Sequence, residues 1–167
     1  PTTGLTINGA LTLIDAKYPS DCATSADALR VQNLCGAELT NAPDIVAIMG
    51  ANYEDYIGDS MRWFVNGQIR MESDRRTSTQ PSTPPTTAAD LGNTPLLPFD
   101  VQDGTAKINL RAGFGSEDEN WTIEAFVNNL TNELTRGVTI STTLRSGSRS
   151  AFIQEPRSYG VTVRTRF

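Results

Sequence analysis

Histidine is absent from the 167-residue sequence, and only two cysteines occur in it. Nucleophilic catalysis by a Ser-His or Cys-His pair therefore lacks its base, and histidine-ligated metal sites are excluded as well. No pair of acidic residues is placed as a convergent general acid and base either. We therefore expect no catalytic residues, no metal site and no cofactor, and we do not expect an enzyme.

Long apolar runs and excess positive charge are missing too. No apolar stretch reaches the about 20 residues that a membrane-spanning helix needs, which excludes a helical membrane protein. The formal net charge is −5. Proteins that bind phosphate backbones need a basic surface, so we expect no nucleic-acid partner.

The two cysteines, Cys22 and Cys35, lie in one polar stretch that is rich in Ser, Thr, Asp and Ala. An even number of cysteines in one such loop favours a disulfide, and hence an oxidising compartment outside the cytoplasm. Two unpaired buried thiols are the alternative, although neither cysteine belongs to an apolar run. The spacing of the two residues does not decide their pairing.

Apolar residues recur at every second position in six segments, separated by residues that favour turns. In the third segment, for example, Trp63, Val65 and Ile69 alternate with Arg62 and Arg70. A period of two residues predicts β-strands, so we expect an all-β, antiparallel fold. The expected strands are 4–16, 44–55, 61–72, 105–115, 121–130 and about 159–167.

The connections between these segments are alternately short and long. We expect no regular structure from 74 to about 100, which is rich in Thr, Ser and Pro, and a long loop over about 131–156. Short periplasmic turns and long extracellular loops are typical of outer-membrane barrels, whose strands need about 9 to 11 residues. A soluble antiparallel sheet can show the same alternation of apolar and polar residues.

Positive side chains occur on only one face of the expected strands. Lipid contact near the midplane would cost about 2 to 4 kcal/mol for each of them, so a membrane strand must turn them into a wet lumen. There we expect them to pair with a plug rather than to attract an anionic solute. A soluble sandwich would instead expose them to solvent. The candidate lumen-facing residues are Arg62, Arg70, Lys107, Arg111, Arg164 and Arg166.

Aromatic residues gather near the ends of the expected strands. Their amphipathic rings favour the membrane–water interface, where barrels carry aromatic girdles. The residues expected there are Tyr53, Tyr56, Trp63, Trp121, Tyr159 and Phe167.

Two motifs stand near the end of the chain, WTIEAFVNNLTNE from Trp121 onward and PRSYGVTVRTRF over 156–167. Together they resemble the end of TonB-dependent outer-membrane receptors, with a Trp-led strand, an Asn-Leu-Thr-Asn turn and a Pro-Arg-aromatic-Gly motif before a terminal Arg-Phe. GLTINGALTLIDAKY and NAPDIVAIMGANYE are similar to earlier strands of that family. The matching residues near the end are Asn129, Leu130, Thr131, Asn132, Pro156, Arg157, Tyr159, Gly160, Arg166 and Phe167.

The resemblance implies the last six strands of an antiparallel up-and-down transmembrane β-barrel of about 22 strands. Residues 1–167 would then be its C-terminal portion, without the plug domain and the earlier strands. The implied function is TonB-dependent import of a scarce solute (a siderophore, cobalamin or an oligosaccharide) across the bacterial outer membrane. The implied signal for the barrel assembly machinery comprises Tyr159, Val161, Val163 and Phe167.

The implied partners are the rest of the barrel and the plug, the TonB complex through segments outside this chain, the barrel assembly machinery, outer-membrane lipid and a small-molecule ligand. Six strands alone would leave two open edges, which hydrocarbon does not tolerate. Self-association into a closed ring is an alternative to a longer chain. A soluble or surface-exposed β-sheet module for binding or adhesion is the main rival, and an outer-membrane enzyme is a weaker one.

Overall fold

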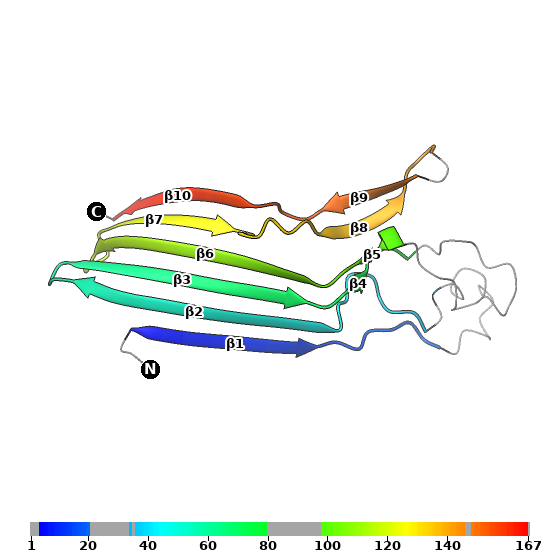
Figure 1. Ribbon diagram of the computed structural model, residues 1–167, viewed down its shortest axis with the longest axis horizontal. Helices are drawn as coiled ribbons and strands as arrows, with labels where there is room; N and C mark the ends of the chain where they lie inside the picture. Colours follow the sequence, from blue (N-terminus) through cyan, green and yellow to red (C-terminus); the bar gives the residue numbers. More distant parts are fainter. Residues whose placement is uncertain (1–3, 21–33, 35, 80–97, 146–147, 167) are drawn as a thin grey trace, which may run out of the picture.

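The computed structural model describes residues 4–20, 34, 36–79, 98–145 and 148–166. Its main feature is one antiparallel sheet of six strands in the order β1-β2-β3-β6-β7-β10 (Figure 1). The all-β, antiparallel prediction is confirmed. The sheet is open in this chain, with β1 and β10 at its edges. The strands are β1 (Leu5–Leu13), β2 (Ile45–Ile57), β3 (Met61–Glu72), β6 (Thr105–Ser116), β7 (Trp121–Asn128) and β10 (Ser158–Thr165).

The two ends of the sheet differ. Residues 58–60 join β2 to β3, and residues 117–120 join β6 to β7, both at the end where β1 starts and β10 finishes (Figure 1). The described parts of the connections that follow β1, β3 and β7 lie at the opposite end (Figure 1). We call these the turn end and the loop end of the sheet.

The strand register sorts the side chains between the two faces. Directly paired residues of an antiparallel ladder project on the same side of the sheet. One row therefore runs across all six strands as Ile7, Ala51, Gly67, Leu110, Val127 and Tyr159. The adjacent row on the other side runs as Thr6, Asn52, Asn66, Arg111, Phe126 and Gly160. We call these sides the apolar face and the polar face.

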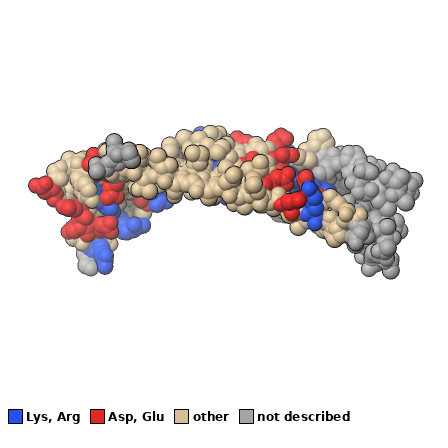
Figure 2. All heavy atoms as spheres, turned by 90° about the horizontal axis from the view of Figure 1, so that it is seen from below, with Lys and Arg blue, Asp and Glu red and all other residues tan. Residues whose placement is uncertain are grey.

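Among the described residues, no second layer of structure packs against the apolar face. Its aliphatic side chains are largely exposed, for example Ile7 at 68% and Val161 at 69%. Within the described residues, Val46 is the single buried hydrophobic side chain. The aliphatic rows therefore do not pack on one another inside a compact core. In the edge-on view of Figure 2, charged side chains gather toward both ends of the bent molecule, with mostly uncharged atoms between them.

Two phenylalanines on the polar face lie over glycines of neighbouring strands. Phe64 is paired with Gly113, and Phe126 is paired with Gly160. A Cβ added at Gly113 would lie 2.7 Å from the tip of the Phe64 ring, and one at Gly160 would lie 2.8 Å from the tip of the Phe126 ring. An aromatic ring that covers a cross-strand glycine shields the backbone there. This packing accounts for two large apolar side chains on an otherwise polar face.

The loop end contains small elements that the sequence did not lead us to expect. The expectation of no regular structure over 74 to about 100 was wrong at its two ends. The long loop expected over about 131–156 contains a hairpin. In that hairpin Thr139 is buried while Val138 and Ile140 are exposed, so polar contacts rather than apolar burial hold it. The elements are β4 (Arg75–Arg76), η4 (Pro98–Asp100), β5 (Val101–Gln102), β8 (Arg136–Ser141) and β9 (Arg149–Ile153).

Candidate functional site

The positively charged residues singled out from the sequence share the polar face. Arg62 is paired with Gly115, Arg111 with Asn66, Arg164 with Thr122, and Arg70 with Lys107. Arg166 follows β10, where its backbone N–H donates to the Asn120 carbonyl at 2.7 Å. The face therefore carries the cations in a spread arrangement rather than in one patch.

Most of these cations already have partners within the chain. Lys107 Nζ donates to Thr135 Oγ1 at 2.8 Å and to Gln154 Oε1 at 3.2 Å. Among the described residues, Arg164 and Arg166 have no carboxylate partner. The ion pairs are Arg62 with Glu54 at 3.4 Å and Glu119 at 3.1 Å, Arg70 with Glu72 at 2.6 Å, and Arg111 with Glu124 at 3.4 Å. The expected pairing with a plug is therefore not needed to neutralise Arg62, Arg70 or Arg111.

Carboxamides occupy the middle of the polar face. Asn52 is paired with Asn66, and Gln68 is paired with Asn109. Asn109 Oδ1 accepts a hydrogen bond from the Asn129 N–H at 2.9 Å. By contrast, the side chains of Asn52, Asn66 and Gln68 make no hydrogen bond within the part of the chain that the structure describes.

These side chains surround a depression of about 460 Å³ on the polar face. Asn66 and Gln68 are exposed, and Asn52 is half-buried, so a solute on this face can reach them. We call this depression the amide site. The polar side chains and the ring that line it are Asn52, Phe64, Asn66, Gln68, Asn109, Arg111, Glu124 and Asn128.

A buried polar cluster lies at the loop end of the sheet. Asp100 is fully buried; it accepts a hydrogen bond from Thr139 Oγ1 at 2.6 Å and forms an ion pair with Arg149. Thr77 Oγ1 lies 2.9 Å from Thr139 Oγ1, and the Thr77 N–H donates to the Asp100 carbonyl at 2.8 Å. We call Thr77, Asp100, Thr139 and Arg149 the loop clamp. It joins the connection after β3 to the hairpin of β8 and β9.

A second set of contacts strengthens this junction. Arg75, which is almost fully buried, forms an ion pair with Glu72 at 2.6 Å and donates to the Arg136 carbonyl at 3.3 Å. The Arg136 N–H donates to Gln102 Oε1 at 2.8 Å, and its guanidinium lies 5.2 Å from the centroid of the Phe99 ring. The long loops are thus held together mainly by polar contacts.

The Asn-Leu-Thr-Asn motif directly follows β7, and its side chains form hydrogen bonds with residues just before β10. Asn129 is buried and has a φ of 52°, and Asn132 has a φ of 55°, a left-handed conformation that asparagine tolerates better than most residues. The Asn129 amide donates to the carbonyls of Glu133 at 2.9 Å and Glu155 at 3.4 Å, and its oxygen accepts from the Glu133 N–H at 2.8 Å. Asn132 Oδ1 accepts from the Arg157 N–H at 3.3 Å. The two motifs quoted from the sequence therefore meet in space.

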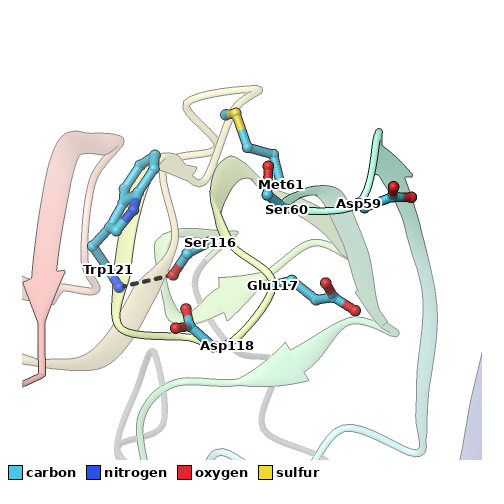
Figure 3. A pocket seen from close by; sticks show the side chains of 7 residues that line it. All are labelled: Asp59, Ser60, Met61, Ser116, Glu117, Asp118 and Trp121. Atoms are coloured by element: carbon cyan, nitrogen blue, oxygen red, sulfur yellow. Dashed lines mark hydrogen bonds between the residues drawn. The ribbon is translucent and has the colours of Figure 1, made fainter.

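The acidic turn between β6 and β7 is a solvated turn. The Trp121 N–H donates to Ser116 Oγ at 3.2 Å across it, and Glu117 and Asp118 point in different directions (Figure 3). A hydrogen bond from Ser116, and a further one from the Asn120 N–H, lower the pKa of the Asp118 carboxyl. No group of three or more metal-binding side chains occurs among the described residues.

Aromatic rings cluster on the apolar face near the turn end. Tyr53 and Trp63 have ring centroids 5.3 Å apart, and Phe114 and Trp121 have centroids 5.9 Å apart in an edge-on contact. Phe114 was not among the residues expected there. Tyr56, which was also expected at an interfacial girdle, pairs with Arg62 and lies on the polar face, away from these rings.

The remaining sequence predictions concern β10 and the cysteines. Tyr159, Val161 and Val163 lie exposed on the apolar face. Cys22, Cys35 and Phe167 lie outside the described residues, so the disulfide and the terminal ring stay predictions. Across the described ranges, no helix has the length and apolar character needed to cross a membrane. Comparison with protein-family models, with curated proteins and with solved structures finds no match.

Proposed function

We propose that this chain is part of the wall of a TonB-dependent receptor β-barrel in the bacterial outer membrane, and that the intact protein imports a scarce solute. One observation carries the proposal. The register places a continuous, uncovered apolar surface on one side of all six strands and the candidate cations on the other. The apolar face then contacts lipid, and the polar face lines the lumen.

The energetics of the two faces support this orientation. Soluble monomers rarely expose a contiguous apolar surface of more than a few hundred square ångströms, whereas a lipid-facing sheet requires one. Each Arg or Lys turned toward lipid at the midplane would cost about 2 to 4 kcal/mol. In the proposed orientation Arg70, Lys107 and Arg111 avoid that cost, because they lie on the face away from lipid.

The open edges of β1 and β10 call for further strands. Unpaired backbone groups in hydrocarbon cost several kcal/mol each, so the sheet must continue until it closes. We infer that the rest of a barrel of about 22 strands, outside this chain, completes the ladder on both sides. A plug inside that barrel and the TonB complex are the other partners of the proposed receptor.

The two ends of the sheet fit the two sides of the membrane. The short turns are the periplasmic side, and the long connections held by the loop clamp are the extracellular side. The rings of Tyr53, Trp63, Phe114 and Trp121 belong to the periplasmic interface. Tyr159, Val161, Val163 and Phe167 are the proposed signal for the barrel assembly machinery. The proposed solute is a siderophore, cobalamin or an oligosaccharide.

Adjacent positions on opposite faces allow a direct test. In the intact protein with Cys22→Ser and Cys35→Ser, single spin labels are attached at Val65→Cys and at Asn66→Cys, and the protein is reconstituted in vesicles. We expect oxygen, which concentrates in lipid, to relax the Val65 label more strongly, and a water-soluble nickel complex to relax the Asn66 label. Fractionation of cells should place the protein in the outer membrane. Uptake of the solute by these cells should stop when the inner membrane is de-energised.

Equal access of the nickel complex to both labels, or recovery of the protein without detergent, would contradict the proposal. That result would favour a water-exposed β-sheet module for binding or adhesion.

A further inference from the structure

The amide site differs chemically from the charged parts of the polar face. Its exposed polar side chains are the carboxamides of Asn66 and Gln68 and the guanidinium of Arg111. The carboxamides carry no net charge and offer both N–H donors and carbonyl acceptors. Asn52, Asn66 and Gln68 have these groups free of hydrogen bonds within the described residues. Three unpartnered amides on adjacent strands therefore present an array of donors and acceptors to whatever occupies this side of the sheet.

The two charged side chains that line the site balance each other. Arg111 lines the depression, but Glu124 lines it too, and the two side chains form an ion pair at 3.4 Å. Arg70, two residues from Gln68 on the same face, is paired with Glu72 at 2.6 Å. Lys107, opposite Arg70 in the ladder, is held by the neutral groups of Thr135 and Gln154. An anionic chelate would therefore have to compete with carboxylates of the chain for these guanidinium groups. An uncharged ligand meets no such competition.

One aromatic ring adds an apolar surface at the edge of the site. Phe64 lines the depression, and the tip of its ring lies over Gly113 of the neighbouring strand. Amides beside an apolar surface suit a ligand that has hydroxyl groups on its rim and C–H groups on its faces. A hydroxyl group both donates and accepts, which matches the dual capacity of a carboxamide.

We propose that Asn52, Asn66 and Gln68 form a subsite for an uncharged, polyhydroxylated solute, of the chemical class of a neutral oligosaccharide. This inference rests on the proposed function, because it needs the polar face to line the path of the solute. It narrows the class of solute and excludes an anionic chelate as the main ligand of this surface.

The test measures the binding of defined probes to the intact, detergent-solubilised protein by isothermal titration calorimetry. The neutral probes are maltohexaose, xylohexaose and mannohexaose, and the anionic probes are hexagalacturonate and ferric citrate. We expect binding of at least one neutral hexasaccharide. Asn66→Ala and Gln68→Ala should each weaken that binding about three- to tenfold, the loss expected for one or two neutral hydrogen bonds.

Asn8→Ala is the matched control. Asn8 is a carboxamide on the same face, two strands from Gln68 along one cross-strand row, but it does not line the depression. Its replacement should change the affinity for the neutral probe less than twofold. The thermal melting temperature of each variant checks that the protein is folded. We expect the control and the two test variants all to remain folded.

Three outcomes would overturn the inference. The first is binding of the anionic probes alone, the second is binding of none of the neutral probes, and the third is neutral binding that Asn66→Ala and Gln68→Ala leave unchanged. The third outcome includes a stable protein in which the two substitutions release the plug but leave the affinity for the probe unaltered. That result would mean that the amides contact a polypeptide. All three leave the spin-label and uptake results of the proposed function intact, so the two failures are distinguishable.

Discussion

Thr139 donates its hydroxyl proton to the Asp100 carboxylate at 2.6 Å, although the two residues are 39 positions apart and neither is in the six-stranded sheet. Since Thr139 has one hydroxyl proton, the neighbouring Thr77 hydroxyl, 2.9 Å away, must be the donor in their mutual contact. The carboxylate of Asp100 therefore organises two hydroxyls and one guanidinium. The described parts of the connection after β3 and the hairpin of β8 and β9 form one unit through that group.

Asp100→Asn should loosen the loop clamp. The substitution removes the charge that faces Arg149, and breaking a buried ion pair by removing one partner costs about 3 kcal/mol or more. The amide of Thr139, which donates to the Thr77 carbonyl at 2.8 Å, reports the change through its hydrogen-exchange rate. We expect that rate to rise by at least tenfold. Asp103→Asn is the control, since Asp103 is exposed and its side chain has no partner among the described residues; equal rates in both variants would refute the clamp.

Gly160→Ala should destabilise the sheet through a single side chain. Its Cβ would meet the ring of Phe126 at 2.8 Å and 3.0 Å, with no backbone atom among its nearest neighbours. Overpacking costs about 1 to 3 kcal/mol in a closed core, and we expect the lower end of that range here because the half-buried Phe126 ring can move aside. Phe126→Leu should remove most of that cost. Denaturant unfolding of the intact protein measures the coupling.

Gly113→Ala is the comparison for that pair. Its Cβ would meet the carbonyl oxygen of Ile123 at 2.7 Å as well as the Phe64 ring, so Phe64→Leu should not rescue it. Equal rescue at both glycines would show that the backbone contact has no effect.

Arginine at neighbouring positions of β2 should distinguish the two faces. Ala51 lies in the middle of the apolar face, and Asn52 lies beside it on the polar face. For a membrane strand, Ala51→Arg should lower the free energy of unfolding by about 2 to 4 kcal/mol, while Asn52→Arg should change it by less than about 1 kcal/mol. Urea unfolding in vesicles measures both. Similar small effects at the two positions would argue against lipid contact.

Asn129→Gly should weaken the link between β7 and β10. The substitution keeps a backbone that tolerates a φ of 52° but removes three hydrogen bonds of a buried side chain. Leaving buried polar groups without partners costs about 1 to 3 kcal/mol. Asn132→Gly is the matched control: Asn132 is exposed and accepts one hydrogen bond at 3.3 Å. A loss of the same size in both variants would show that backbone freedom, rather than the amide, is responsible.

The lowered pKa of Asp118 predicts that the stability of the turn between β6 and β7 depends on pH. Its folded-state pKa is lowered by the Ser116 hydrogen bond and then by the Asn120 N–H, so the ionised form favours the turn. That contribution is present above the ordinary aspartate pKa, near 3.8, and is lost as the pH falls through the lowered folded-state pKa. The Asn120 amide shift in an NMR pH titration should show a midpoint below 3.8, and Asp118→Asn should abolish it. A midpoint at or above the ordinary value would contradict the assignment.

Much of the sheet could be predicted from the sequence. The period of two in segments such as 61–72 assigns each side chain to a face as soon as the strand forms, because successive residues of an extended chain point to opposite sides. The positions of the six strands and the common face of Arg62, Arg70 and Lys107 follow from that local geometry. The lumen, the lipid contact and the closed barrel stay predictions.

Only the tertiary structure decided which side chains meet across the faces and the loops. Arg111 pairs with Glu124 because the register of β6 and β7 sets them diagonally opposite, and a shift of register would give Arg111 another neighbour. The contact of Thr77 with Thr139 spans 62 positions, and the hairpin of β8 and β9 buries a threonine instead of an aliphatic residue. Such polar contacts depend on where separate loops come together, and no local periodicity encodes them. The amino-acid pattern therefore determined the two faces of the sheet, whereas long-range packing decided the loop clamp and the amide site.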